Sequence, residues 1–145
     1  VNPSNLRIRI GTVVADMIGE CGGYSEEAAQ IDMGGGMTGG CTASADIPIA
    51  KANGGIVVYN EKDAKSVDEE PCIRCARCVQ ACPMGLDPYK LKHLCDAGNL
   101  EGAKANHVMD CILCGCCSYA CPSRRWLTAA FKNTKDAIAA AARRK

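Results

Sequence analysis

The stretch CIRCARCVQACP at residues 72–83 decides how this chain is organised, and CILCGCCSYACP at residues 111–122 repeats its pattern. Each run spaces its cysteines by two, two and three residues and ends in cysteine followed by proline. A pattern that recurs with its spacing intact indicates one kind of site built twice. The cysteines are Cys72, Cys75, Cys78 and Cys82 in the first run and Cys111, Cys114, Cys117 and Cys121 in the second run.

This spacing is typical of two-cluster bacterial ferredoxins, in which thiolates hold [4Fe–4S] cubes. Three cysteines spaced three residues apart surround one corner of a cluster. Proline after the fourth cysteine fixes φ and donates no N–H, so the chain turns away there. The fourth cysteine then points at the other cluster, which predicts crossed ligand sets. Cluster 1 takes Cys72, Cys75, Cys78 and Cys121, and cluster 2 takes Cys111, Cys114, Cys117 and Cys82.

Zinc and disulfides explain this pattern less well. Zinc needs four ligands in a closed tetrahedral set, usually as two separated pairs, which leaves the third cysteine of each run without a role. Disulfide frameworks are typical of short secreted chains. The sequence shows no apolar secretory segment at its start, so we expect paired clusters instead.

The remaining four of the 12 cysteines lie outside this spacing. Cys116 stands beside Cys117, but only Cys117 keeps two residues before it and three after it, as in the first run. Cys116 is therefore expected to be a small buried residue near the cluster. Cys21, Cys41 and Cys95 stand alone, and we assign them no chemistry.

At 145 residues, the chain has room for one or two small domains. Hydrophobic residues make up 48%, but only six are aromatic, so bound clusters are expected to contribute to folding. Twelve cysteines without a secretory signal predict a reducing cytoplasm. The apolar runs are far shorter than the ~20 residues of a membrane span.

Charge divides the chain just before the first run. Residues 1–70 carry five basic and eleven acidic side chains, and residues 71–145 carry twelve basic and five acidic ones. Each oxidised cluster with four thiolates carries about −2, which offsets part of the basic excess. The rest is expected to face an anionic partner or a membrane surface. Nucleic-acid binding is not expected, because stacking aromatics do not interleave with the basic residues.

Residues 1–60 are predicted to form a small α+β domain of β-grasp type. Apolar residues recur with period two in the predicted strands and at helical spacing in the predicted helix, which Thr12 is expected to cap. The strands at 47–49 and 56–59 are expected to meet at a turn at residues 53–55. The predicted elements are strand 6–10, helix 13–21, and strands 28–33, 47–49 and 56–59.

A glycine-rich loop at residues 34–40 formally satisfies the dinucleotide fingerprint. That fingerprint must open a long helix within a βαβ unit, and Pro48 leaves no room for one. We expect a tight structural loop there instead, in contact with a partner.

Residues 61–70 form an acidic linker, and residues 71–145 are predicted to form a helical ferredoxin domain. Asp87 is expected to cap a helix with Pro88 at its first position, and a second helix runs from 100 to 108. The insert between the runs, residues 83–110, is too long for a compact two-hairpin ferredoxin, which favours helices as the scaffold.

A final helix follows Cys121, capped by Ser123. Its stripe either packs on its own domain or docks on a partner. The stripe consists of Leu127, Ala130, Phe131, Ile138 and Ala142, and the basic end of Arg143, Arg144 and Lys145 suits the helix dipole.

These features together resemble the C subunit of the Rnf complexes, over nearly the whole chain. In the second half the matching stretches are PCIRC at 71–75, CPMGL at 82–86, DCILCG at 110–115 and CSYACPSRR at 117–125. In the first half they are LRIRIGT at 6–12, CGG at 21–23, GGGM at 34–37, DIPI at 46–49, Lys51 and GGI at 54–56.

The resemblance implies a membrane-bound ferredoxin:NAD oxidoreductase that couples electron transfer to Na⁺ or H⁺ movement. The C subunit of that family is peripheral, on the cytoplasmic side, and contacts other subunits. It carries FMN and the NADH site in an upstream domain, then a soluble-ligand-binding β-grasp domain and two [4Fe–4S] clusters. No flavin domain precedes Val1 in this sequence, so we expect a C-terminal fragment, or a subunit whose first part is not represented, and assign FMN and NAD(H) to no residue.

We expect a relay of single electrons between the absent flavin and a partner subunit, without a catalytic residue in this chain. Arg74, Arg77 and Arg125 are expected to raise the cluster potentials. Two alternatives stay open: part of a related cobalamin reductase, and a pure interaction module with structural clusters.

Overall fold

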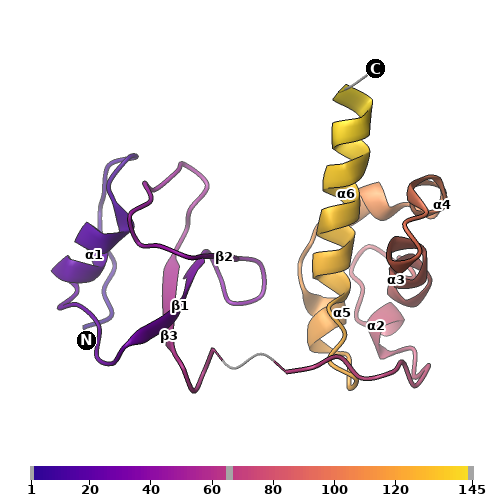
Figure 1. Cartoon of the computed structure of the whole chain (residues 1–145), viewed down its shortest axis with the longest axis horizontal. Helices are drawn as coiled ribbons and strands as arrows, with labels where there is room; N and C mark the ends of the chain where they lie inside the picture. Colours follow the sequence, from indigo (N-terminus) through magenta and orange to yellow (C-terminus); the bar gives the residue numbers. More distant parts are fainter. Residues whose placement is uncertain (1, 65–66, 144–145) are drawn as a thin grey trace. The chain divides into compact units, whose positions relative to one another are not determined.

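The computed structural model describes residues 2–64 and 67–143, which form two compact units. The N-terminal unit ends before residue 67 and the C-terminal unit begins there. Figure 1 shows one unit of mixed helix and strand and one that is helical. The predicted α+β class is confirmed.

A three-stranded antiparallel sheet forms the centre of the N-terminal unit. Its middle strand is β1 (Ala28–Met33), which lies between β2 (Gly40–Thr42) and β3 (Ile56–Asn60). In the register of the sheet, Ile31 stands opposite Thr42 on one side and Val58 on the other. The prediction for residues 28–33 and 56–59 is confirmed, while β2 was not predicted.

Helix α1 (Val14–Glu20) covers the buried side of this sheet, close to the predicted helix at 13–21. Thr12 does not cap it: the N-cap residue is Val13, and the Thr12 hydroxyl donates to the Arg9 carbonyl at 2.8 Å. The small core of the unit joins Val14, Ile18, Ile31 and Ile49.

The predicted strand at residues 6–10 is wrong, because no strand forms within these described residues. A period-two pattern produces a strand only where a neighbouring strand pairs with it, and the sheet ends at β3. Ile10 is accordingly 69% exposed.

The predicted hairpin across residues 53–55 is also wrong. β3 pairs with β1, and residues 47–49 instead run beside the start of α1. There the Val14 amide donates to the Ile47 carbonyl at 3.0 Å and the Ile49 amide to the Thr12 carbonyl at 2.8 Å. Burial of Ile49 in the core fixes this segment at the helix.

The glycine-rich loop is a tight turn between β1 and β2, and a strand follows it where the dinucleotide fingerprint requires a helix. The Gly39 amide donates to the Gly35 carbonyl at 2.6 Å. A Cβ on Gly39 would lie 2.7 Å from that carbonyl oxygen, so this position requires glycine.

Helices form the C-terminal unit, as predicted. Within residues 2–64 and 67–143, no helix is long and apolar enough to cross a bilayer. The elements are α2 (Arg77–Gln80), α3 (Pro88–Asp96), α4 (Leu100–Ala105), the 3-10 turn η1 (Val108–Asp110), α5 (Cys116–Tyr119) and α6 (Leu127–Arg143).

Local capping sets two of these helices. Asp87 accepts from the Lys90 amide at 3.1 Å with Pro88 at the first position of α3, as predicted. Asn99 caps α4 by accepting from the Gly102 amide at 2.7 Å. The predicted helix at 100–108 stops earlier, at Ala105, and the separate turn η1 begins at Val108.

The core of the C-terminal unit lies between α3 and α6. Ala130 and Ile138 pack against it, whereas Ala142 is exposed, and Arg144 and Lys145 lie outside the described residues. The stripe on α6 therefore packs on its own unit. The buried residues are Leu91, Ala103, Val108, Cys117, Leu127 and Phe131.

Ser123 is not the cap of α6. The helix begins at Leu127, and the Ser123 hydroxyl donates to the Pro71 carbonyl at 2.9 Å. Just before the helix start, the Trp126 amide donates a hydrogen bond to the carboxylate of Glu69, a residue of the predicted linker.

The end of the predicted acidic linker is thus docked on the C-terminal unit. The Glu70 amide donates to the Ser123 carbonyl at 3.0 Å. Lys92, only 7% exposed, lies 3.7 Å from Glu69 and 2.7 Å from Asp96, and Asp96 also pairs with Arg125 at 3.3 Å. Two cations and two carboxylates balance one another in this group.

Phe131→Ala is expected to lower the free energy of unfolding of the C-terminal unit by about 3–5 kcal/mol, because it leaves a cavity at a side chain only 1% exposed. Urea unfolding followed by the fluorescence of Trp126 measures this. The neighbouring exposed Lys132→Ala is the control, with an expected change of about 0.5 kcal/mol or less. Equal losses in both variants would contradict this core.

Candidate iron–sulfur centre

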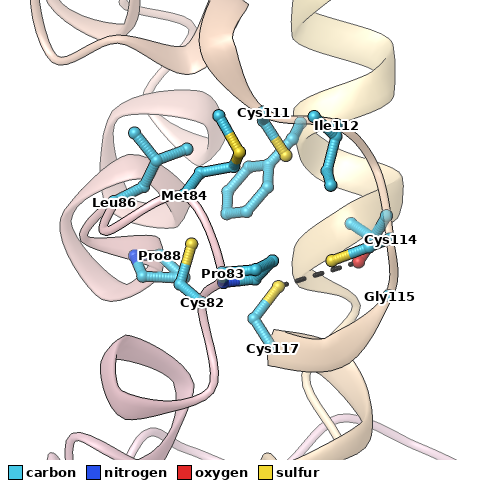
Figure 2. Close-up of a pocket in the computed structure, with 12 residues that line it drawn as sticks. Cys82, Pro83, Met84, Leu86, Pro88, Cys111, Ile112, Cys114, Gly115 and Cys117 are labelled. Carbon is cyan, nitrogen blue, oxygen red and sulfur yellow. Dashed lines mark hydrogen bonds between the residues drawn. The ribbon is translucent and has the colours of Figure 1, made fainter.

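Four of the predicted ligands line one pocket of the C-terminal unit: Cys82 from the first run with Cys111, Cys114 and Cys117 from the second. Figure 2 shows their four sulfur atoms gathered around this space. The pocket therefore contains all members of the set predicted for cluster 2, including the cysteine that comes from the other run.

Apolar side chains complete this pocket. Soft thiolates select iron–sulfur clusters, zinc or Cu(I), and an apolar shell limits solvent access. The donor set and its surroundings fit a cluster better than a hard cation. The apolar lining residues are Pro83, Met84, Leu86, Pro88, Ile112 and Phe131, the last from α6.

Helix α6 also contributes Thr128 to the pocket. Its hydroxyl lies 3.7 Å from the Cys117 sulfur, the dashed contact in Figure 2, and 2.9 Å from the Ser118 hydroxyl. Burial raises the pKa of the Cys117 thiol above its ordinary value, the bond with Thr128 lowers it, and Cys111 and Cys114 raise it further. These thiols are thus close enough to interact electrostatically.

Cys116 and Cys117 have different surroundings. Cys117 is buried and lines the pocket, whereas Cys116 is half-buried and is not among the lining residues. A hydrogen bond between Cys116 and Cys114 raises the pKa of the Cys116 thiol. Cys116 therefore lies beside the pocket, in contact with one of its thiols.

Three of the four cysteines predicted for cluster 1 lie near one another in the structure. Burial raises the pKa of the Cys78 thiol, and the nearby Cys121 and Cys72 raise it further, so a cysteine of the second run lies close to two of the first. Cys75 is exposed. The Arg74 amide donates to the Cys72 sulfur at 3.4 Å, the kind of contact that tunes a cluster.

Both runs turn through left-handed backbone at matching positions. L-residues avoid this conformation, at about 1–2 kcal/mol each, and such strain gathers at functional sites. The L-residues are Arg74 (φ 54°) and Ala76 (φ 58°) in the first run and Leu113 (φ 56°) in the second. Gly115 (φ 81°), which matches Ala76, adopts this conformation without the steric cost.

The repeat continues beyond the cysteines, which sequence analysis missed. Helices α2 and α5 begin at Arg77 and Cys116, and α3 and α6 begin at Pro88 and Leu127. Each pair is separated by the same offset in sequence as the first cysteines of the two runs. The residue types in the later helices differ, so only this shared offset signals the duplication.

The other cysteines lie elsewhere. Cys41 faces Asp32 across β1 and β2, and the hydrogen bond between them raises the pKa of that thiol. Cys95 packs against the helical core. Cys21 lines a hollow of about 690 Å³ in the N-terminal unit, between residues 2–8, α1 and β3, which no sequence motif predicted.

Among the described residues, no three His, Cys, Asp or Glu side chains converge as a single metal ion requires. In a [4Fe–4S] cube each iron takes its own cysteine, so the four thiolates surround a group of atoms. A pocket ringed by thiols suits that arrangement.

Comparison with known proteins agrees with this chemistry. Residues 64–122 match the 4Fe-4S dicluster domain family, a stretch that includes both cysteine runs. The chain is 43% identical over 101 residues to the C subunit of the ion-translocating oxidoreductase complex of Rhodobacter capsulatus, a match that covers 70% of this chain and 20% of that protein.

The chain is homologous to the C subunits of the ion-translocating oxidoreductase complexes. The C subunit of the Clostridium ljungdahlii proton-translocating ferredoxin:NAD(+) oxidoreductase complex is 41% identical over 72% of this chain and 23% of its own length. The C subunit of the Methanosarcina acetivorans ion-translocating oxidoreductase complex is 34% identical over 92% of this chain and 30% of its own length.

The predicted resemblance to the Rnf C subunit is therefore confirmed, and the chain spans about a fifth to a third of the length of these relatives. The dicluster match supports iron–sulfur clusters as the cofactor. The names of these relatives do not favour the cobalamin reductase alternative.

The two adjacent cysteines of the second run give a direct test of the pocket. Cys117→Ser is expected to remove about half of the bound iron after anaerobic reconstitution, because it deletes a thiolate that lines the pocket. Cys116→Ser is the matched control and is expected to keep the full amount of bound iron. Iron analysis decides, and the opposite result would assign the ligand to Cys116.

The left-handed turns give a second test. Ala76→Gly is expected to raise the free energy of unfolding by about 1 kcal/mol, because glycine adopts φ 58° without steric cost. Ala137→Gly, at an exposed position within α6, is expected to lower it by about 1 kcal/mol. Chemical unfolding of both variants checks the opposite signs, and a loss in both would contradict the turn.

Proposed function

We propose that this chain is the electron-relay part of the C subunit of a membrane-associated ferredoxin:NAD oxidoreductase. It passes single electrons through two [4Fe–4S] clusters. The observation that carries the proposal is the meeting of Cys82 with Cys111, Cys114 and Cys117 in one pocket. Homology to the C subunits of ion-translocating oxidoreductases supports it.

The ligand sets are the crossed ones. Bound clusters would supply one-electron redox chemistry, which protein side chains lack. Cys72, Cys75, Cys78 and Cys121 hold cluster 1, and Cys111, Cys114, Cys117 and Cys82 hold cluster 2.

The rest of the chain positions and shields these thiols. The buried Phe131 keeps water from its side of the second set, and low solvent access is one determinant of cluster potential. Thr128 orients the Cys117 sulfur. Contact between α2 and α5 holds the two runs beside each other, which keeps the path between the clusters short.

The flavin, the NADH site and the ion-translocating subunits of the proposed complex lie outside this chain. We place FMN and the NADH site in an upstream domain, with this chain as the C-terminal part of the subunit. Residues 1–60, within the N-terminal unit, correspond to the β-grasp domain of that family. Residues 61–70 join them to the ferredoxin domain at 71–145. The subunit is peripheral on the cytoplasmic side and relays electrons to partner subunits that move Na⁺ or H⁺.

Anaerobic reconstitution with iron and sulfide tests the cofactor. We expect about eight irons per chain and, after reduction, EPR signals of two interacting S = 1/2 centres. About four irons, or a single isolated signal, would overturn the pairing of two clusters.

Cys75→Ser tests the relay in the assembled complex. Loss of a ligand of cluster 1 is expected to abolish most NADH-linked electron flow through the complex. The control is Cys95→Ser, in the helical core outside both sets. Full electron flow in the Cys75 variant would favour the interaction module with structural clusters.

A further inference from the structure

One lysine of α6 is bound to the backbone of the second run. Lys135 Nζ donates to the Cys111 carbonyl oxygen at 2.6 Å and to the Met109 carbonyl oxygen at 3.1 Å. Thr128 and Phe131 of the same helix line the pocket, and Lys135 stands one turn beyond Phe131. The ammonium group is therefore fixed at the residue that provides the first thiol of the run.

This cation has no carboxylate partner within the part of the chain that the structure describes. Its two hydrogen bonds go to neutral carbonyl groups. The positive charge is held in place by these bonds without being neutralised. It is half-buried, so solvent screens it less than a fully exposed charge.

The first run lacks an equivalent cation at this position. When the two halves are aligned on their cysteine runs, α3 matches the start of α6, and Asp96 stands where Lys135 stands. Asp96 pairs with Lys92 and Arg125, and Lys92 also faces Glu69. The charges near the end of α3 pair with one another, whereas Lys135 has no carboxylate partner among the described residues. The nearby Asp110 instead faces His107, at 3.2 Å.

A fixed cation favours the more negative, reduced form of a nearby cluster, because reduction adds one electron to a group that already carries about −2. Net charge and hydrogen bonding are established determinants of cluster potential. An ammonium group without a carboxylate partner, bound to the Cys111 carbonyl, changes both the net charge and the hydrogen bonding near the cluster.

We propose that Lys135 tunes cluster 2, raising its reduction potential selectively while leaving cluster 1 unchanged. The proposal rests on the proposed function, since it requires both clusters to be bound. Lys135 is a tuning and positioning residue: it acts through its charge and through the Cys111 carbonyl, without ligating iron.

EPR-monitored redox titration of the reconstituted chain, with dithionite as the reductant, tests this. Lys135→Gln keeps a hydrogen-bond donor but removes the charge. One of the two midpoint potentials is expected to fall by the equivalent of about tenfold in the electron equilibrium, ~59 mV for a one-electron couple. Lys135→Arg, which keeps the charge, is expected to restore it.

Lys132→Gln, one turn earlier on α6 and exposed, is the matched control, and both of its midpoints are expected to equal those of the unmodified chain. Unchanged midpoints in Lys135→Gln, or equal shifts of both, would overturn the tuning role. Loss of one cluster from Lys135→Gln would also overturn it, in favour of a structural clamp. If the unmodified chain itself binds fewer than two clusters, the proposed function fails first.

Discussion

The exchange of the fourth cysteine between the two runs is the constraint on which the C-terminal unit depends. Cys82 ends the first run, yet it lies with the thiols of the second in one pocket. Cys121 ends the second run and lies close enough to Cys78 to affect its pKa. In the proposed ligand sets neither run supplies all four thiols, and the contact between α2 and α5 holds the two runs beside each other.

Local signals in the sequence were enough to predict most of this unit. The cysteine spacing, the cap at Asp87 with Pro88, and the apolar stripe of α6 each depend on residues a few positions apart. The start of α6 was not predictable in this way. Glu69 accepts from the Trp126 amide although the two lie far apart in sequence, and Ser123, the apparent cap, is used to hold Pro71. A hydrogen bond from a residue far away in the sequence leaves no pattern around the helix start that it holds.

The N-terminal unit shows the same limit more strongly. Alternation at residues 6–10 predicts a strand, but strand formation depends on a partner that sequence periodicity does not reveal. Residues 47–49 and 56–60 lie near each other in sequence, yet the second segment pairs with β1 and the first with the start of α1. The glycine-rich loop was predictable because steric exclusion at Gly39 is a local effect.

The sequence offset shared by both cysteine runs and by their following helices has one further consequence. A chain with one such half would complete its thiol sets only by pairing with a second copy about a two-fold axis. The order of elements in the C-terminal unit is thus that of two such halves joined in a single polypeptide. In a true homodimer both halves must keep identical side chains. Fusion removes that requirement, which is why Asp96 and Lys135 can occupy equivalent positions with opposite charge.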